Sequence, residues 1–354
     1  MNRGIGSRVG RWLVVAALCA LPVQGVAGNG PARLVVVAKS GGDYTSPIAA
    51  VNSITDASAN NPYLVKVMPG VYDLGNASLQ MKPYVYLEGS GDSSVITSTV
   101  ANADGQCFVG TVNMANNSTV RNISIKNIGL GGETHFSAVV FSDATATLES
   151  VSVFAGSDAN HYNEVSAVCS RGASTNATLK NVYLEAHSNT GNSDPLAVTD
   201  NSNMTVTNSR LIAVSADSNH VVDCHNFQSV PVEESFSMAT LTITNSYLEG
   251  NGSAVNNNEI IYGSGCKKIT VTNSTLVGTQ TGWTRALTTS RDATIINSQI
   301  YAVPAVELDT SSGNTVKIFN SLIFGAQVTA SSDLTNIKLF HDYDENGNPI
   351  PDHQ

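Results

Sequence analysis

A phrase that recurs eight times along the chain, at intervals of 23 to 37 residues, constrains the fold more than any other feature of the sequence. Each copy, such as VRNISIKNIG or TVTNSTLVGT, starts with apolar or β-branched residues, reaches a polar anchor and continues as an alternating apolar segment. This period and alternation indicate a solenoid whose coils each hold short strands. Leucine-rich repeats share the period, but the helix and leucine scaffold that they need are missing. The repeat therefore predicts an all-β, right-handed parallel β-helix.

The polar anchor of the repeat is asparagine in seven copies and glutamate in one. Asparagine tolerates the tight bend between two strands, and its amide can bond the amides of neighbouring coils. We therefore expect a structural asparagine ladder along the solenoid. The anchors are Asn122, Glu149, Asn181, Asn208, Asn245, Asn273, Asn297 and Asn320.

A single β-helix domain is expected behind an N-terminal leader. Ser46 and Pro47 precede IAAVNSI and predict the N-cap and first turn of a short helix. Such a helix would cover the open end of the coil stack, where strand edges are otherwise unpaired. The predicted parts are a signal peptide at 1–28 and a domain at 29–354, with the N-terminal cap and first coils at 35–91, repeated coils at 116–328 and a C-terminal cap at 329–354.

The first residues predict export from the cell. Arg3, Arg8 and Arg11 form a basic segment, the apolar run WLVVAALCALPV follows, and small residues come just before position 28. This is the pattern of a signal peptide cleaved near 27–28, and the apolar run is shorter than the roughly 20 residues of a membrane-spanning helix. No second long apolar run follows. We expect a secreted protein, extracellular or periplasmic, without a membrane span.

Charge and cysteine content narrow the function classes further. Without residues 1–28, the 18 basic residues fall to 15 against 28 acidic ones, a net charge of −13. Such a surface disfavours nucleic acid as a partner, and we expect a monomer. The spacing of the remaining cysteines matches no zinc motif, and in an oxidising compartment they allow two disulfides in three alternative pairings. These cysteines are Cys107, Cys169, Cys224 and Cys266.

Two long intervals of the repeat predict inserted loops, one before Asn181 and one before Asn245. Loops of this length on a regular scaffold often carry function. The second interval contains His220, Asp223, Cys224 and His225, which raises the alternative of a metal site. Their spacing fits no standard metal pattern, and Cys224 is better explained as half of a disulfide. Nothing in the sequence requires a cofactor.

The opening of the predicted domain resembles pectin methylesterases. VVVAKSGGDYTSPIAAVNSI at 35–54 resembles the first strand, turn and capping helix of that family. VKVMPGVYDL at 65–74 resembles its proline-glycine-x-tyrosine segment, and YVYLEGSG at 84–91 resembles the strand and turn that follow. The resemblance covers 35–91 well and the rest only as a general coil pattern. It implies a β-helix that acts on a pectin-like polysaccharide.

The resemblance also implies candidate catalytic residues. The family uses a nucleophilic aspartate, an acid-base aspartate, two glutamines that stabilise an oxyanion and an orienting arginine. By position, Asp194 falls on the nucleophile and Asp158 on the acid-base residue. Both glutamine positions hold serine, Ser137 and Ser157. The arginine has no counterpart, because Arg285 comes too late in the chain. The alternative is that both aspartates are turn residues.

Other residues predict sugar or ion binding. Trp283, in a turn sequence, could stack on a sugar face, as could Tyr162 and Phe227 in the inserted loops. Near the C-terminus, DYDENGN places residues like the first half of a calcium loop, although the position that would carry the last ligand is His353. A polar turn is the alternative. The calcium candidates are Asp342, Asp344 and Asn346.

Two hypotheses of function follow. The first is a secreted, pectinesterase-like protein that binds or modifies an extracellular polysaccharide, as a carbohydrate (methyl)esterase with an altered site. The second is a non-catalytic surface or adhesion β-helix, because one scaffold serves both purposes. The first requires an arginine or an equivalent cation near paired aspartates, and the second does not.

Overall fold

The structure is a computed structural model, and it describes most of the residues that follow the expected signal peptide. The leader itself lies outside the described residues. Residues 302, 306–310 and 328–330 are described by their backbone only. The structure describes residues 33–102, 107–129, 135–156, 164–225, 239–251, 257–278, 284–289, 291–302, 306–310, 315–324, 328–330, 337–344 and 346–352.

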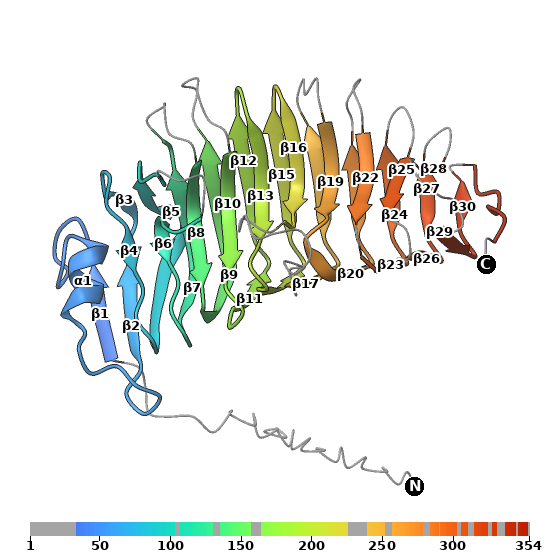
Figure 1. The fold of residues 1–354 in the computed structure, drawn as a ribbon. Coiled ribbons are helices and arrows are strands. Elements are labelled where there is room, and N and C mark those ends of the chain that lie inside the picture. Colours follow the sequence, from blue (N-terminus) through green and yellow to red (C-terminus); the bar gives the residue numbers. More distant parts are fainter. Residues whose placement is uncertain are drawn as a thin grey trace, which may run out of the picture.

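Two parallel sheets run along the length of a coiled stack, one with ten strands and one with twenty (Figure 1). Every pairing between named strands is parallel, and each coil returns the chain to the strand beside its starting point. The smaller sheet contains β28 (Val328–Ala330), β25 (Val306–Thr310), β22 (Thr284–Thr289), β19 (Asn257–Gly263), β16 (Ser218–Asp223), β13 (Asn192–Val198), β10 (Glu164–Arg171), β8 (His135–Ser142), β6 (Gly110–Asn113) and β4 (Leu79–Gln80).

The larger sheet receives two strand segments from most coils. After β13, for example, the chain passes through β14 and β15 before it returns to the smaller sheet at β16. The strands of the larger sheet are β1 (Arg33–Val37), β2 (Tyr63–Val67), β3 (Gly70–Asp73), β5 (Val85–Ser98), β7 (Thr119–Asn127), β9 (Thr145–Gly156), β11 (Asn176–Lys180), β12 (Tyr183–Ser188), β14 (Asn203–Thr207), β15 (Arg210–Ser215), β17 (Ala239–Thr244), β18 (Tyr247–Asn251), β20 (Cys266–Thr272), β21 (Thr275–Gly278), β23 (Ala293–Ile296), β24 (Gln299–Ala302), β26 (Val316–Phe319), β27 (Leu322–Phe324), β29 (Ile337–Phe340) and β30 (Tyr343–Asp344).

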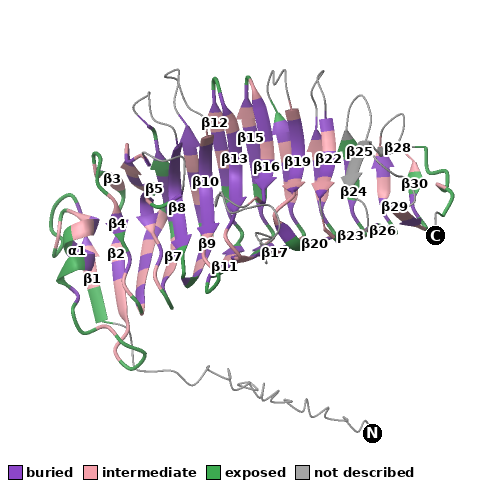
Figure 2. Cartoon of the chain, viewed as in Figure 1, coloured by how far each residue is buried: buried purple, intermediate pink, exposed green. Residues whose placement is uncertain are grey.

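The interior of the stack is filled by columns of aliphatic side chains. One column consists of residues that pair across successive coils and are at most 3% exposed. Each such side chain contributes about 1.5–3 kcal/mol relative to an exposed one. The alternation of the repeat thus places one residue in two inside the core, and Figure 2 shows the middle coils as largely buried. The column contains Leu148, Leu179, Val206, Ile243, Val271, Ile295, Ile318 and Leu339.

The bend between the two strand segments of each coil is made by a residue in the left-handed region. Seven of the predicted anchors occupy it, with φ from 48° at Asn297 to 53° at Asn181. One side-chain bond joins two of them, from Asn245 Nδ2 to Asn208 Oδ1 at 3.2 Å. The eighth anchor was predicted one residue too early. Glu149 pairs with Lys180, so the residue at the bend is Ser150, whose φ is 55°.

A column of buried serines directly after the asparagines was not predicted. Each hydroxyl donates to the carbonyl two residues earlier and accepts from a backbone N–H one coil before, which belongs to Val182 for Ser209 and to the preceding serine of the column for the other four. Ser246 N–H, for instance, donates to Ser274 Oγ at 3.1 Å, and Ser274 Oγ donates to Thr272 O at 2.9 Å. These bonds satisfy polar groups that the bend would leave without partners. The column contains Ser209, Ser246, Ser274, Ser298 and Ser321.

The N-terminal end of the stack carries the predicted helix, α1 (Pro47–Ser53). Ser46 is its N-cap, with Oγ accepting from Ala49 N–H at 3.4 Å, and Pro47 opens the helix. Ala50 and Val51 are buried against the first coils. This confirms the expected capping helix, which Figure 1 shows over the first strands.

Two disulfides resolve the pairing that the sequence left open. Cys107 pairs with Cys169, and Cys224 pairs with Cys266. The first lies on the outer side of the smaller sheet, in a small apolar cluster separate from the main core. The second belongs to the interior core. The part of the chain that the structure describes contains no helix with the length and hydropathy of a membrane span.

Candidate functional site

The outer face of the smaller sheet carries an unusual set of ionisable side chains. Phe136 and Val165 point into the core, and Ser193 Oγ likewise points inward, donating to Ala186 O at 2.6 Å. Because side chains alternate along a strand, the residue that follows each of these points outward. We call the resulting line of residues the outer row. It consists of Ser137, Ser166, Asp194, His220, Glu259 and Arg285, on β8, β10, β13, β16, β19 and β22.

Charges alternate along the second half of the outer row. His220 Nδ1 lies 3.4 Å from Asp194 Oδ1, and His220 Nε2 lies 3.8 Å from Glu259 Oε2. Arg285 Nη1 donates to Glu259 Oε1 at 2.9 Å, and Thr288 Oγ1 donates to the same oxygen at 3.2 Å. Neighbouring parallel strands lie about 4.8 Å apart, so residues one coil apart in sequence become direct neighbours. The row is therefore a continuous chain of acid, imidazole, acid and guanidinium.

Asp223 and His225 extend this cluster to the side. Asp223 is the residue three positions after His220, on the same face of β16, and its Oδ2 lies 3.9 Å from His220 Nδ1. His225 Nδ1 lies 2.6 Å from the same oxygen. Tyr262 stacks on His220, with the ring centroids 5.1 Å apart. The imidazole of His220 is thus held on one side by an aromatic ring and at both nitrogens by carboxylates.

Burial makes the carboxylates of this cluster unusual. Asp194 is fully buried, and neither of its side-chain oxygens takes part in a hydrogen bond with the residues that the structure describes. Burial raises the pKa of Asp194 to about 8, and the negative charges of Asp223 and Glu164 act in the same direction. For Asp223 burial acts in the same sense, but the charge and hydrogen bond of His225 outweigh it and lower the pKa.

The two histidines respond to the surrounding acids. Burial lowers the pKa of His220, but the close contact with Asp194 and the charges of Asp223, Asp194 and Glu259 outweigh it and raise the pKa to about 9. Burial also lowers the pKa of His225, and Asp223 raises it to about 9. Asp194, His220 and His225 therefore retain protons to a higher pH than the same groups would in isolation.

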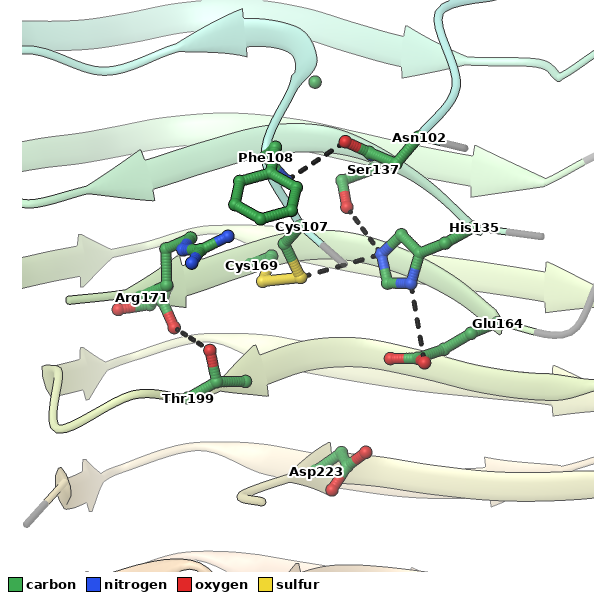
Figure 3. Close-up of a disulfide and its surroundings, with 12 residues drawn as sticks. Asn102, Cys107, Phe108, His135, Ser137, Glu164, Cys169, Arg171, Thr199 and Asp223 are labelled. Carbon is green, nitrogen blue, oxygen red and sulfur yellow. Dashed lines mark hydrogen bonds and ion pairs between the residues drawn. A yellow bond between two sulfur atoms is a disulfide. The ribbon is translucent and has the colours of Figure 1, made fainter. Parts of the chain in front are cut away.

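The first half of the outer row is sealed beneath a disulfide (Figure 3). His135 Nε2 lies 3.1 Å from Ser137 Oγ, and His135 Nδ1 lies 3.5 Å from Glu164 Oε2. This order of hydroxyl, imidazole and carboxylate matches that of serine hydrolases. Both His135 and Ser137 are fully buried, however, and Cys107 Sγ lies 3.6 Å from His135 Nε2. The arrangement is closed to a substrate in this structure. It lies beside the second half of the outer row, where His220 and Arg285 are partly exposed.

A cation–π contact lies next to the buried His135 and the disulfide of Cys107. Phe108 is half exposed, and the guanidinium of Arg171 lies 3.9 Å from its ring centroid. Asn102 fixes the segment, because its Oδ1 accepts from the backbone N–H groups of Phe108 and Val109. The disulfide and these contacts hold residues 107–109 against the smaller sheet, as Figure 3 shows.

The structure brings together some of the residues predicted from the resemblance. Ser137 and Asp194 both lie on the outer row, on either side of Ser166. The other predicted catalytic and sugar-binding residues lie outside the described residues. They are Asp158, Ser157, Tyr162, Phe227 and Trp283.

Four residues of the row and its side were misplaced or missed by the predictions from sequence. His220 and Asp223 were assigned to an inserted loop, whereas they lie on strand β16. Arg285 was set aside as too late in the chain, yet β22 places it on the row beside Glu259. Glu259 itself was not singled out.

The calcium candidates use their carboxylates in turns. Asp342 Oδ1 accepts from Ser321 N–H at 2.7 Å, at the end of the serine column, and its Oδ2 accepts from Phe340 N–H. Asp344 Oδ1 accepts from the backbone N–H groups of Asn346 and Asn348. These oxygens satisfy backbone donors, which is the role of the polar turn that the sequence offered as the alternative.

Comparisons with known proteins relate the chain to polysaccharide enzymes by fold. No protein-family model matches it, and no curated protein matches its sequence. Among solved structures, the pectate lyase Pel9A aligns with a TM-score of 0.59 at 14% identity, over 91% of this chain and 82% of that one. Pectin methylesterase PemA from Erwinia chrysanthemi aligns with a TM-score of 0.42 at 12% identity, over 91% of each chain. The pectin methylesterase from carrot gives 0.40 at 13% identity, over 88% of each.

The pectate lyase alignment shows the fold and nothing finer. Together with the parallel pairing of both sheets, it confirms the predicted right-handed parallel β-helix. The chain is thus a pectin-lyase-like β-helix.

Proposed function

We propose that the protein is a secreted enzyme that binds an extracellular polysaccharide across the outer face of the smaller sheet and modifies it at the outer row. One observation carries the proposal. Asp194, His220 and Glu259 stand on successive strands of this face, with a fully buried carboxylate that receives no hydrogen bond from the described residues. Burying such a group costs stability, so its presence is better explained by function than by folding.

The proposal is favoured over a non-catalytic adhesion module by the cations that the row contains. Sequence reasoning required an arginine or an equivalent cation near paired carboxylates. Arg285 pairs with Glu259 on the row, and His220 lies between Glu259 and Asp194. An adhesion surface has no need for a buried chain of alternating charges. The arrangement supplies bases, proton donors and a guanidinium within one site.

Access to the row is limited but present. The side chains of His225, Arg285 and His220 are 25%, 15% and 13% exposed, whereas Asp194 is closed off behind them. A polysaccharide lying along the stacked strands would meet these three groups first. Secretion is supported by the signal-peptide pattern and by the two disulfides, which persist in oxidising compartments.

The first test exposes the purified secreted protein to methyl-esterified pectin, de-esterified pectin and a neutral glucan. Released methanol reports ester hydrolysis, new reducing ends report chain cleavage, and ultraviolet absorbance of an unsaturated product reports elimination. We expect one of these products from a pectic substrate, with a loss of at least about 100-fold in Asp194→Asn.

The matched control is Asp73→Asn, which makes the same change in an exposed turn of β3, where Asp73 Oδ1 accepts from Gly75 N–H. It should leave the rate unchanged. If the folded wild-type protein forms no product and binds none of the three glycans, the enzyme proposal is wrong and the adhesion module becomes the better account.

A further inference from the structure

We propose that the outer face holds a divalent transition-metal ion between Asp194, His220 and Asp223. The inference concerns the cluster itself and does not depend on which reaction the protein performs.

The three side chains already converge. One ligand atom from each lies within 4.8 Å of the others. His220 Nδ1 is 3.4 Å from Asp194 Oδ1 and 3.9 Å from Asp223 Oδ2. Around an ion with bonds of about 2.0–2.2 Å, neighbouring tetrahedral ligands lie about 3.4 Å apart. Small side-chain rotations would therefore complete the coordination without moving the strands.

The carboxylates lack the donors that a purely structural role would provide. Both side chains are almost completely buried. Among the described residues, the two oxygens of Asp194 have no hydrogen-bond partner, and the same holds for Oδ1 of Asp223. A buried carboxylate without donors is costly, and a cation in its place satisfies several lone pairs at once. Elsewhere in the fold, the carboxylates of Asp342 and Asp344 accept backbone N–H groups.

The neighbours of His220 are arranged as a support for a metal ligand. With Nδ1 facing the two aspartates, Nε2 faces Glu259 at 3.8 Å. A ligating histidine commonly directs its other ring nitrogen to a carboxylate, which fixes the ring and raises its basicity. Arg285 and Thr288 hold that carboxylate by hydrogen bonds, and Tyr262 stacks on the ring. The row beyond His220 then acts as a positioning network.

The donor set selects the class of ion. It combines two carboxylates with one imidazole, and a second group of Glu164, Asp223 and His225 shares Asp223 as a member. Calcium takes six to eight oxygen ligands, whereas imidazole with carboxylate suits zinc and related transition ions. We therefore assign the site to Zn²⁺ or Mn²⁺ rather than to Ca²⁺.

The test is isothermal titration calorimetry without any glycan. The protein is treated with a chelator, freed of the chelator by gel filtration, and titrated with Zn²⁺, Mn²⁺ and Ca²⁺ in separate experiments. We expect one Zn²⁺ or Mn²⁺ per chain, with affinity reduced at least about 100-fold in both Asp194→Asn and His220→Gln. The matched control is His187→Gln, which removes an imidazole paired with Glu185 on β12 of the larger sheet. It should leave the affinity unchanged.

A second measurement needs no variant. Visible absorption of Co²⁺ bound to the wild-type protein reports mixed nitrogen and oxygen coordination, so the proposal stays testable if a variant fails to fold. The proposal is overturned if neither Zn²⁺ nor Mn²⁺ binds, if only Ca²⁺ binds, or if a folded His220→Gln protein binds as tightly as the wild type. Product formation from glycans is measured separately, so either proposal can fail without the other.

Discussion

His220 and Asp194 lie one coil apart in sequence, yet Nδ1 of the histidine is 3.4 Å from Oδ1 of the aspartate on the outer face of the smaller sheet. The contact exists because parallel strands stack at about 4.8 Å, so that the same position of successive coils forms a line. That line continues to Glu259 and Arg285. A cluster of buried charges on the outside of a β-helix is difficult to explain by folding, and it is where we expect function.

Replacement of Asp194 should separate stability from function. In chelator-treated protein, Asp194→Asn replaces a buried carboxyl group that receives no hydrogen bond from the described residues, so the free energy of unfolding should stay the same or rise by about 1 kcal/mol. Product formation should fall in the same variant. Urea denaturation measures the first effect. A loss of more than about 2 kcal/mol would show instead that the carboxylate holds the fold together.

The serine column should contribute directly to stability. Ser274→Ala leaves Ser246 N–H without its acceptor inside the stack and removes the bond to Thr272 O. An unsatisfied buried donor costs about 1–3 kcal/mol, and we expect a loss of that size in urea denaturation. Thr270→Ala, at a partly exposed position of β20, is the control and should cost clearly less. Equal losses in the two variants would mean that the column is not a stabilising element.

The bend residues should depend on their backbone conformation. Asn273 has φ of 50°, a region that residues with a Cβ generally avoid. Asn273→Ala should lower the free energy of unfolding by about 1 kcal/mol, because alanine lacks the local bonding that makes asparagine tolerant of this region. Asn273→Gly should cost less than the alanine variant. The reverse order would contradict the assignment of the bend.

A pH dependence is expected at Glu88 on β5. The hydrogen bond from Lys66 lowers the pKa of Glu88, and the bond and charge of Arg121 act in the same direction against burial. A folded-state pKa below the unfolded value of 4.5 gives stability that is present above that pH and lost as the pH falls through the folded-state value. Glu88→Gln should therefore cost about 1 kcal/mol at neutral pH.

The difference between wild type and Glu88→Gln should narrow below pH 4.5, where the wild-type carboxylate also begins to be protonated. Thermal denaturation of both proteins across the acidic range measures it. A difference that stays constant with pH would show that the glutamate acts through packing and not through its charge.

Most of the fold could be predicted from sequence because each copy of the repeat contains the local signals for its strands and its bend. The alternation of apolar residues gives the strands, and the asparagines mark the bends with φ near 50°. Ser46 and Pro47 mark the start of α1. The serine column was missed because a small residue after the anchor looks like a space-filling choice. Its role appears only when the N–H of one coil meets the hydroxyl of the next.

The candidate site was harder to predict because it depends on register across coils. Asp194 and Ser137 came from a resemblance, and the structure places both on the outer row. His220 was read as part of a loop because the interval before Asn245 is long, and the length of a turn does not tell which residues return to the sheet. Arg285 was set aside because it comes late in the chain. In a stack of parallel strands, however, residues far apart in the sequence can be neighbours on one face, and Arg285 pairs with Glu259.

The most direct test of the central claim compares two glutamates on different faces of the helix. Glu259 lies on the outer row, whereas Glu185 lies on β12 of the larger sheet beside Tyr183 and His187. We predict that Glu259→Gln lowers the rate of product formation from the pectic substrate at least about 100-fold and that Glu185→Gln leaves it unchanged. Equal rates in the two folded variants would contradict the assignment of the outer row as the reaction centre.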